Sequence, residues 1–221
     1  MVPRPLVGPC LIVGEGEDDE AFFRHLVEQR NLNGFQVAFP GKPESDTGGK
    51  KGFGQLLVAL RVLEGFEKIS GIVIVTDSDD DAGSAFAKLR EQIESAETYP
   101  VPDRPFTIAT RGGSPDIAVV LLPEADQPGN LETLCLGAAL DKWFSLRPCV
   151  EDFVRCTNAE SWPKSKLSKL QMRCFLSAAC KSDPYTPLKW AWSRPETLIP
   201  LDHSAFDRIT SFLNSFRANY K

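Results

Sequence analysis

The sequence predicts an α/β protein in which helices cover both faces of a parallel sheet. Short, continuous apolar runs at 10–13 (CLIV) and 71–76 (GIVIVT) have the composition of strands buried on both faces. Segments with apolar residues at helical spacing alternate with these runs along the chain. Because parallel strands need crossover connections, this alternation favours a sheet whose strands all end at one edge.

The first 125 residues carry the expected sheet. Strands are expected where apolar or alternating segments occur, at 10–13, 35–39, 71–76, 106–110 and 117–123. Helices are expected where apolar residues recur every three or four positions, at 18–30, 53–63 and 85–93. We therefore expect residues 1–125 to form an α/β domain that binds its ligand at the carboxyl ends of its strands.

The pattern changes after residue 125. Apolar residues at helical spacing predict helices over 131–138, 164–181 and 204–217. We expect residues 126–221 to form a helical extension packed on the sheet domain.

Composition limits the classes of function. The chain has 221 residues and a formal net charge of −5, which argues against a broad electrostatic nucleic-acid binder. This net charge does not exclude a nuclease that contacts phosphate through metal ions and a local basic patch. Six cysteines without a CxxC pair, together with two histidines, disfavour a structural zinc site. We expect reduced thiols and a cytoplasmic protein. The apolar N-terminal stretch is short, proline-broken and followed by acid, so we expect neither a signal peptide nor a membrane span.

Carboxylates gather directly after two of the expected strands. The first run is EGEDDE at 15–20 and the second is DSDDD at 77–81. Like charges repel, so either water solvates these turns or a cation lies among them. In extended backbone, Asp77 and Asp79 point the same way, and Glu15 would face them from the neighbouring strand. Hard oxygen ligands of this kind favour Mg²⁺.

These two motifs resemble the Toprim domain. The motif EGxxD (Glu15, Gly16, Asp19) follows the first strand, and hhhhxDxD (Asp77, Asp79) ends a later one. Primases, type IA and type II topoisomerases, OLD-type nucleases and recombination-mediator proteins share this domain, and the resemblance covers about residues 8–125. The later segments PGNLETLCL and LDHSAFDRITSFL resemble small, free-standing Toprim-like proteins and the nuclease domain of OLD proteins.

The Toprim resemblance implies roles for individual residues. Asp77 and Asp79 would hold Mg²⁺ or Mn²⁺, and Glu15 would be a ligand or a general acid/base. The residues that would bind a second cation or support the first are Asp19, Asp81 and Glu132. A lysine near the scissile phosphate would be Lys166 or Lys164, and the sequence does not decide between the lysines of 164–169.

The implied function is metal-assisted hydrolysis of nucleic acid, with DNA favoured over RNA, and with a possible protein partner that supplies an ATPase or a basic surface. The chain lacks an obvious topoisomerase tyrosine and the ATPase domain of OLD enzymes, which favours hydrolysis over strand passage. Two alternatives stay open. One is a non-catalytic Toprim-fold adaptor, and the other is a phosphotransfer enzyme with Asp77 as the nucleophile.

Two loops are candidates for phosphate contacts. The segment TGGKKGFG at 47–54 fails the spacing of a Walker A loop, but Lys50 or Lys51 and nearby backbone N–H groups could face a phosphate before a helix. Arg111, in RGG after an expected strand, is a further candidate. A plain loop at 47–54 and a plain turn at 111–113 are the alternatives.

Overall fold

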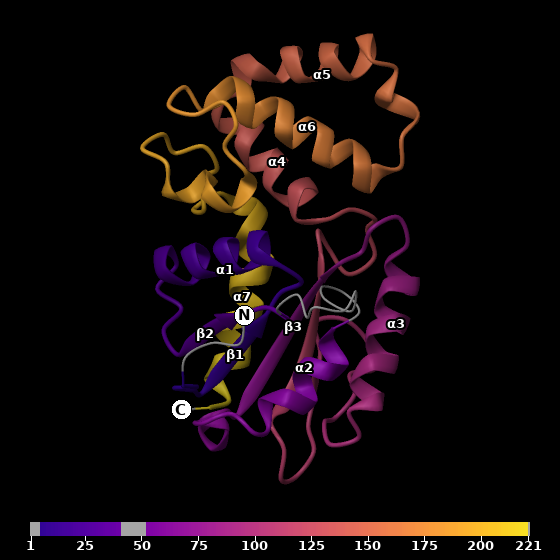
Figure 1. Cartoon of the computed structure of the whole chain (residues 1–221), viewed down its shortest axis with the longest axis vertical. Coiled ribbons are helices and arrows are strands. Elements are labelled where there is room, and N and C mark those ends of the chain that lie inside the picture. The colour runs from indigo at the N-terminus through magenta and orange to yellow at the C-terminus, as the bar shows by residue number, and fades with distance from the viewer. Residues whose placement is uncertain (1–4, 41–51, 221) are drawn as a thin grey trace.

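The computed structural model describes residues 5–40 and 52–220 and confirms the predicted α/β class (Figure 1). Its described part contains one five-stranded sheet in the spatial order β2-β1-β3-β5-β4. The strands are β1 (Cys10–Val13), β2 (Phe35–Ala38), β3 (Gly71–Asp77), β4 (Ile108–Ala109) and β5 (Asp116–Leu122). The first three and β5 pair in parallel, so their carboxyl ends meet at one edge.

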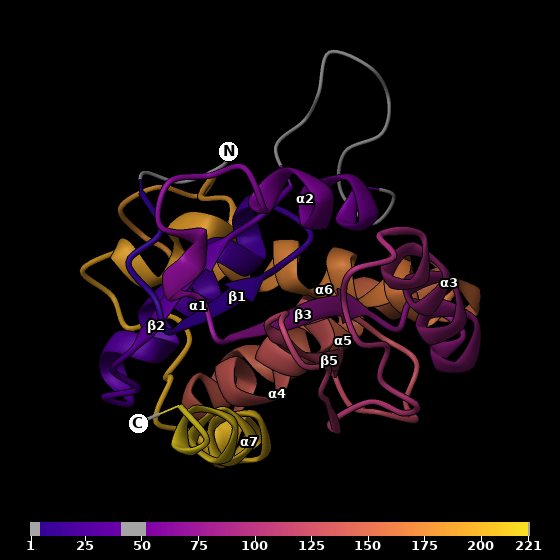
Figure 2. The same cartoon turned by 90° about the horizontal axis from the view of Figure 1, so that it is seen from below.

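Helices cover both faces of this sheet. They are α1 (Glu17–Gln29), α2 (Phe53–Leu60), α3 (Ala82–Ser95), α4 (Leu131–Lys142), α5 (Arg147–Cys156), α6 (Lys164–Ala179) and α7 (Asp207–Ala218). Side chains of a strand alternate between faces. Ile72 and Ile74 of β3 therefore pack with α2 and α3, whereas Val73 and Val75 pack with α1, α4 and α7. Figure 2 shows the sheet between α2 on one side and α4 and α7 on the other.

The strand expected at 106–110 differs from the prediction. Only Ile108–Ala109 form β4, and this strand is antiparallel to β5. Phe106 has a φ of 58°, which lies outside the extended region and ends the strand pattern on that side. Because β4 is antiparallel to β5, the two strands are joined where β5 begins, beside the start of β3. The loop from β4 to β5 therefore lies at the edge opposite the carboxyl ends of the parallel strands.

The C-terminal helices share a core with the sheet. Buried residues of α4, α6 and α7 belong to the same apolar cluster as Phe22 and Phe23 of α1. A short 3₁₀ segment, η5 (Leu188–Ser193), completes this cluster through Leu188 and Ala191. Helix α5 was not among the predicted helices, although Val150, Phe153 and Val154 recur at helical spacing and Val150 and Val154 are buried. No helix in 5–40 or 52–220 has both the length and the apolar character needed to cross a membrane.

Candidate active site

The ends of β1 and β3 are joined by a side chain. The Oε1 atom of Glu15 accepts a hydrogen bond from the backbone N–H of Asp77 at 2.7 Å and another from the hydroxyl of Thr76. The two strands pair in parallel from Cys10 and Gly71 onward, so both acidic runs begin at the same edge of the sheet. The structure therefore brings Glu15 and Asp77 together, as the strand order requires.

Asp77 in turn contacts the beginning of α4. Its Oδ1 atom accepts the backbone N–H of Leu131 at 3.0 Å, and the backbone carbonyl of Asp79 accepts the N–H of Gly129 at 2.6 Å. A helix N-terminus carries unpaired N–H groups and a partial positive charge, which favours a carboxylate at this place. The next residue, Glu132, lies in the first turn of α4 and adds another carboxylate to this end of the helix.

Asn130 fixes α4 against α6. This residue is fully buried, and its Oδ1 atom accepts the N–H of Thr133 at 3.0 Å and the hydroxyl of Ser168 at 2.7 Å. Its Nδ2 atom donates to the carbonyl of Ser165 at 2.8 Å. Asn130 was not among the predicted site residues, although an Asn directly before an apolar helical pattern is a recognised capping signal.

Asp19 holds the turn between β1 and α1. Its Oδ2 atom accepts the backbone N–H groups of Glu15 at 3.1 Å and of Gly16 at 3.0 Å, and the residue is buried. Burial, followed by the charge of Glu15, raises the pKa of Asp19 to about 7. The geometry makes Asp19 a residue that positions the backbone of Glu15.

Several carboxylates surround one buried thiol. Burial raises the pKa of Cys135, in α4, well above its usual range. Nearby negative charges raise it further, those of Glu132, Asp19, Asp18 and Asp77. Because these four residues come from α1, β3 and α4, their shared influence on Cys135 shows that the negative charges converge on one region. Burial likewise raises the pKa of Glu132 and of Asp18.

Two cations of α6 act electrostatically on this region. The charge of Lys169 lowers the pKa of both Asp18 and Glu132, against the larger effect of their burial, and Arg173 acts on Glu132 in the same direction. Lys164, Lys166 and Lys169 are all exposed, and the charge of Lys169 is among the main influences on both Asp18 and Glu132. We therefore select Lys169 as the candidate lysine of 164–169. Its spacing of four residues from Arg173 on one helix was the available sequence signal.

The remaining residues of the second acidic run point to different neighbours. Asp79 has a φ of 49°, so the extended backbone assumed for 77–79 ends at Asp77. Asp80 accepts the N–H of Ser165 at 3.3 Å, at the beginning of α6. Asp81 caps α3, because its Oδ1 atom accepts the N–H of Ser84 at 3.0 Å.

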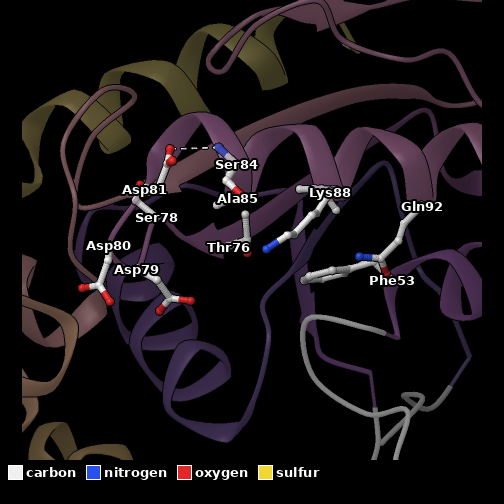
Figure 3. Close-up of a pocket in the computed structure, with 11 residues that line it drawn as sticks. Phe53, Thr76, Ser78, Asp79, Asp80, Asp81, Ser84, Ala85, Lys88 and Gln92 are labelled. Atoms are coloured by element: carbon white, nitrogen blue, oxygen red, sulfur yellow. Dashed lines mark hydrogen bonds between the residues drawn. The ribbon is translucent and has the colours of Figure 1, made fainter. Parts of the chain in front are cut away.

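A cavity of about 600 Å³ opens beside Asp79, between the end of β3 and α3 (Figure 3). Thr76 lines it from β3, Ser78 from the turn that follows, and Lys88 from α3. Figure 3 shows the ammonium group of Lys88 pointing into the cavity, toward Thr76 and Asp79. Since the hydroxyl of Thr76 also donates to Glu15, the cavity borders the Glu15–Asp77 contact.

Of the predicted phosphate contacts, Arg111 does not join this site in the structure. Arg111 lies in the loop from β4 to β5, at the opposite edge of the sheet, and donates to the carbonyl of Glu97 at 2.7 Å. The antiparallel direction of β4 explains this placement. Lys50 and Lys51 lie outside the described residues.

The donor chemistry of the site fits a hard cation. Glu15, Asp77 and Glu132 offer carboxylate oxygens, the ligands that Mg²⁺ and Mn²⁺ prefer. Within 5–40 and 52–220, no group of three or more His, Cys, Asp or Glu side chains is already arranged around a common ion position. Glu15 and Asp77 accept hydrogen bonds from the protein instead. Each carboxylate has further oxygen lone pairs that a cation could use.

A comparison with protein families matches residues 9–218 to the family described as "Protein of unknown function (DUF3226)". Because the match spans nearly the whole chain, the protein belongs to this family. Searches of curated proteins and of solved structures returned no match.

Proposed function

We propose that this protein is a Mg²⁺-dependent phosphodiesterase of the Toprim type that hydrolyses nucleic acid. One observation carries the proposal: the Glu15 carboxylate accepts the backbone N–H of Asp77, so the two acidic runs begin side by side at the carboxyl edge of the sheet. In α/β folds, this edge is where ligands bind. Glu132 adds a carboxylate from the first turn of α4.

The proposed roles follow from these contacts. Bound Mg²⁺ would supply charge neutralisation and polarisation at a phosphodiester. Asp77 and Glu15 would hold the cation, supported by Glu132 on one side and by Asp79 on the other. Asp19 would fix the Glu15 backbone through the two N–H groups that it accepts. Asp81 is better explained as the cap of α3 than as a ligand.

The basic residues of α6 support a phosphate ester as the substrate. The charges of Lys169 and Arg173 act on Glu132, which supports a site that also receives an anionic group. A lysine near a scissile phosphate stabilises the negative charge that develops during displacement. Because the chain has a net charge of −5, we expect weak non-specific affinity for nucleic acid and a small number of phosphate contacts.

A second candidate is the adaptor without catalysis. It is favoured by the hydrogen bonds that Glu15 and Asp77 already receive from the protein, because these bonds satisfy both carboxylates in part without a cation. The phosphotransfer alternative requires an acyl-phosphate at Asp77, and Glu15 then has no evident role.

The test is a cleavage assay with Mg²⁺ and Mn²⁺ on supercoiled, linear and single-stranded DNA and on RNA. The proposal expects metal-dependent cleavage by the wild type that is lost in Asp77→Asn while the circular dichroism spectrum stays unchanged. Glu20→Gln is the matched control, because it removes a carboxylate from the first acidic run at a residue that pairs with Arg24 instead. Cleavage that survives in Asp77→Asn would refute the proposal. Mass spectrometry of Asp77 would detect a trapped phosphoryl group.

A further inference from the structure

The cavity between β3 and α3, here called the α3 cavity, contains apolar and polar side chains of α2 and α3 that have no role in the proposed metal chemistry. Its volume of about 600 Å³ lies within the range of roughly 300–1,000 Å³ that is common for small-molecule sites. Phe53, Ala85 and Leu89 give it an apolar part. Lys88, Gln92 and the hydroxyl of Ser84 give it polar groups.

The charges around the α3 cavity limit what it can bind. Asp79, Asp80 and Asp81 line one end of it, so a bare anion such as a phosphate would be repelled there. Among the described residues that line the cavity, Lys88 is a cation that points inward (Figure 3). An uncharged group with an aromatic face, carbonyl oxygens and N–H groups is complementary to the side chains that line the cavity. It can contact Phe53 and Leu89, accept from Lys88, and donate to a carboxylate.

The position of the cavity connects it to the proposed reaction site. Thr76 lines the cavity and also donates its hydroxyl to Glu15, and Asp79 lines it from the turn that follows Asp77. A nucleotide whose phosphate lies at Glu15 and Asp77 would therefore have its sugar and base beside the cavity.

We infer that the α3 cavity binds the unpaired base of the nucleotide next to the scissile phosphate, so that the substrate is single-stranded or has an unpaired end. This inference rests on the proposed function and deepens it. A base in a duplex is paired and stacked, and it must leave the stack before it can enter a cavity. Lys88 and Gln92 then contact the edge of the base, and the apolar side chains of Phe53, Ala85 and Leu89 contact its face.

The experiment measures binding by calorimetry in Ca²⁺, with deoxyribonucleoside 5′-monophosphates and with 2-deoxyribose 5-phosphate as the probe without a base. The wild type should bind the nucleotides more tightly than the sugar phosphate. Ala85→Phe fills the cavity and should weaken nucleotide binding by about tenfold or more, with no effect on the sugar phosphate. Ala87→Phe is the matched control, because this alanine is exposed on the same helix and does not line the cavity.

A second variant tests the same cavity without adding a bulky side chain that could cause misfolding. Lys88→Gln changes an exposed side chain and should weaken nucleotide binding while the melting temperature stays within the error of the wild type. The inference is overturned if nucleotides and the sugar phosphate bind equally, or if Ala85→Phe and Lys88→Gln both fold and bind nucleotides as the wild type does.

Failure of the inference can be told apart from failure of the proposed function. Metal-dependent cleavage that requires Asp77, without any preference for a base, would preserve the phosphodiesterase and refute the base pocket. A preference for nucleotides that Ala85→Phe removes, in a protein that cleaves nothing, would support the pocket and refute the hydrolysis.

Discussion

The two acidic runs at 15–20 and 77–81 look alike in sequence, but their carboxylates have different neighbours. In the first run, Glu17 pairs with Lys189, Asp18 accepts the N–H of Lys189 at 2.7 Å, and Glu20 pairs with Arg24. This run therefore ties α1 to η5. In the second run, Asp80 contacts the start of α6 and Asp81 caps α3, so this run ties the end of β3 to helices on both sides.

In each run, the carboxylate closest to its strand has different contacts from the carboxylates that follow it. Glu15 accepts the backbone N–H of Asp77 across the β1–β3 pair, and the Asp77 carboxylate accepts the N–H of Leu131 at the start of α4. Most of these carboxylates therefore have structural partners, and Glu15 and Asp77 form the candidate reaction site. Substitutions at the strand ends should change activity, and substitutions farther along each run should change stability.

The largest expected effect is on catalysis at Asp77. Under the proposed function, Asp77→Asn removes a metal ligand and should lower the cleavage rate by about a hundredfold or more. Single-turnover cleavage of single-stranded DNA in Mg²⁺ measures this rate. Glu20→Gln should cleave at the wild-type rate, and an equal loss in both variants would show that the strand-end position has no special role.

Asn130→Ala tests the contact between α4 and α6. The substitution leaves the Thr133 N–H, the Ser165 carbonyl and the Ser168 hydroxyl without this partner. We expect the free energy of unfolding to fall by about 2–3 kcal/mol, as measured by urea denaturation. Ser211→Ala, on the exposed side of α7, should leave stability unchanged. A loss below 0.5 kcal/mol in Asn130→Ala, roughly the scatter of exposed substitutions, would contradict this structural role.

Lys169→Ala tests which lysine serves the site. Because the charge of Lys169 acts on both Asp18 and Glu132, its removal should lower the cleavage rate by about tenfold. Lys164→Ala removes the same charge from the first position of α6 and should have a smaller effect on the rate. If Lys164→Ala or Lys166→Ala has the larger effect, the assignment to Lys169 is wrong.

The smallest expected effect concerns the surface of α1. Glu20→Gln breaks an ion pair with Arg24 at 2.8 Å, and the arginine side chain is 62% exposed. Such pairs on a helix contribute about 0.3–0.5 kcal/mol, so thermal unfolding should shift by no more than one or two degrees. A larger shift would mean that the first acidic run is more strongly coupled to the fold than its contacts suggest.

The fold was predictable where its signal is local. The doubly buried runs CLIV and GIVIVT and the helical spacing of 131–138 depend on nearby residues, and each became an element of the expected type. The short, antiparallel β4 was not predictable, because the left-handed backbone of Phe106 is set by its surroundings. Likewise, the left-handed backbone of Asp79 is set by its surroundings, whereas the sequence pattern predicted extended backbone there.

The site was predictable only in part. The order of two motifs on two parallel strands was enough to bring Glu15 and Asp77 to one edge. The roles of their neighbours depend on contacts between distant segments: Asp80 meets Ser165, which lies 85 residues away, and Asp18 meets Lys189, which lies 171 residues away. Periodicity carries no information about such contacts, so it could not separate structural carboxylates from candidate ligands or choose Lys169 among the lysines of α6.

The central claim is that the ends of β1 and β3 hold a divalent cation. The most direct measurement is a Mn²⁺ titration followed by electron paramagnetic resonance, with wild type, Asp77→Asn, Glu15→Gln and Glu20→Gln compared at equal protein concentration. We expect saturable binding that both strand-end variants weaken by about tenfold or more and that Glu20→Gln leaves unchanged. Absence of binding in the wild type, or equal binding in all four proteins, would contradict it and favour the adaptor.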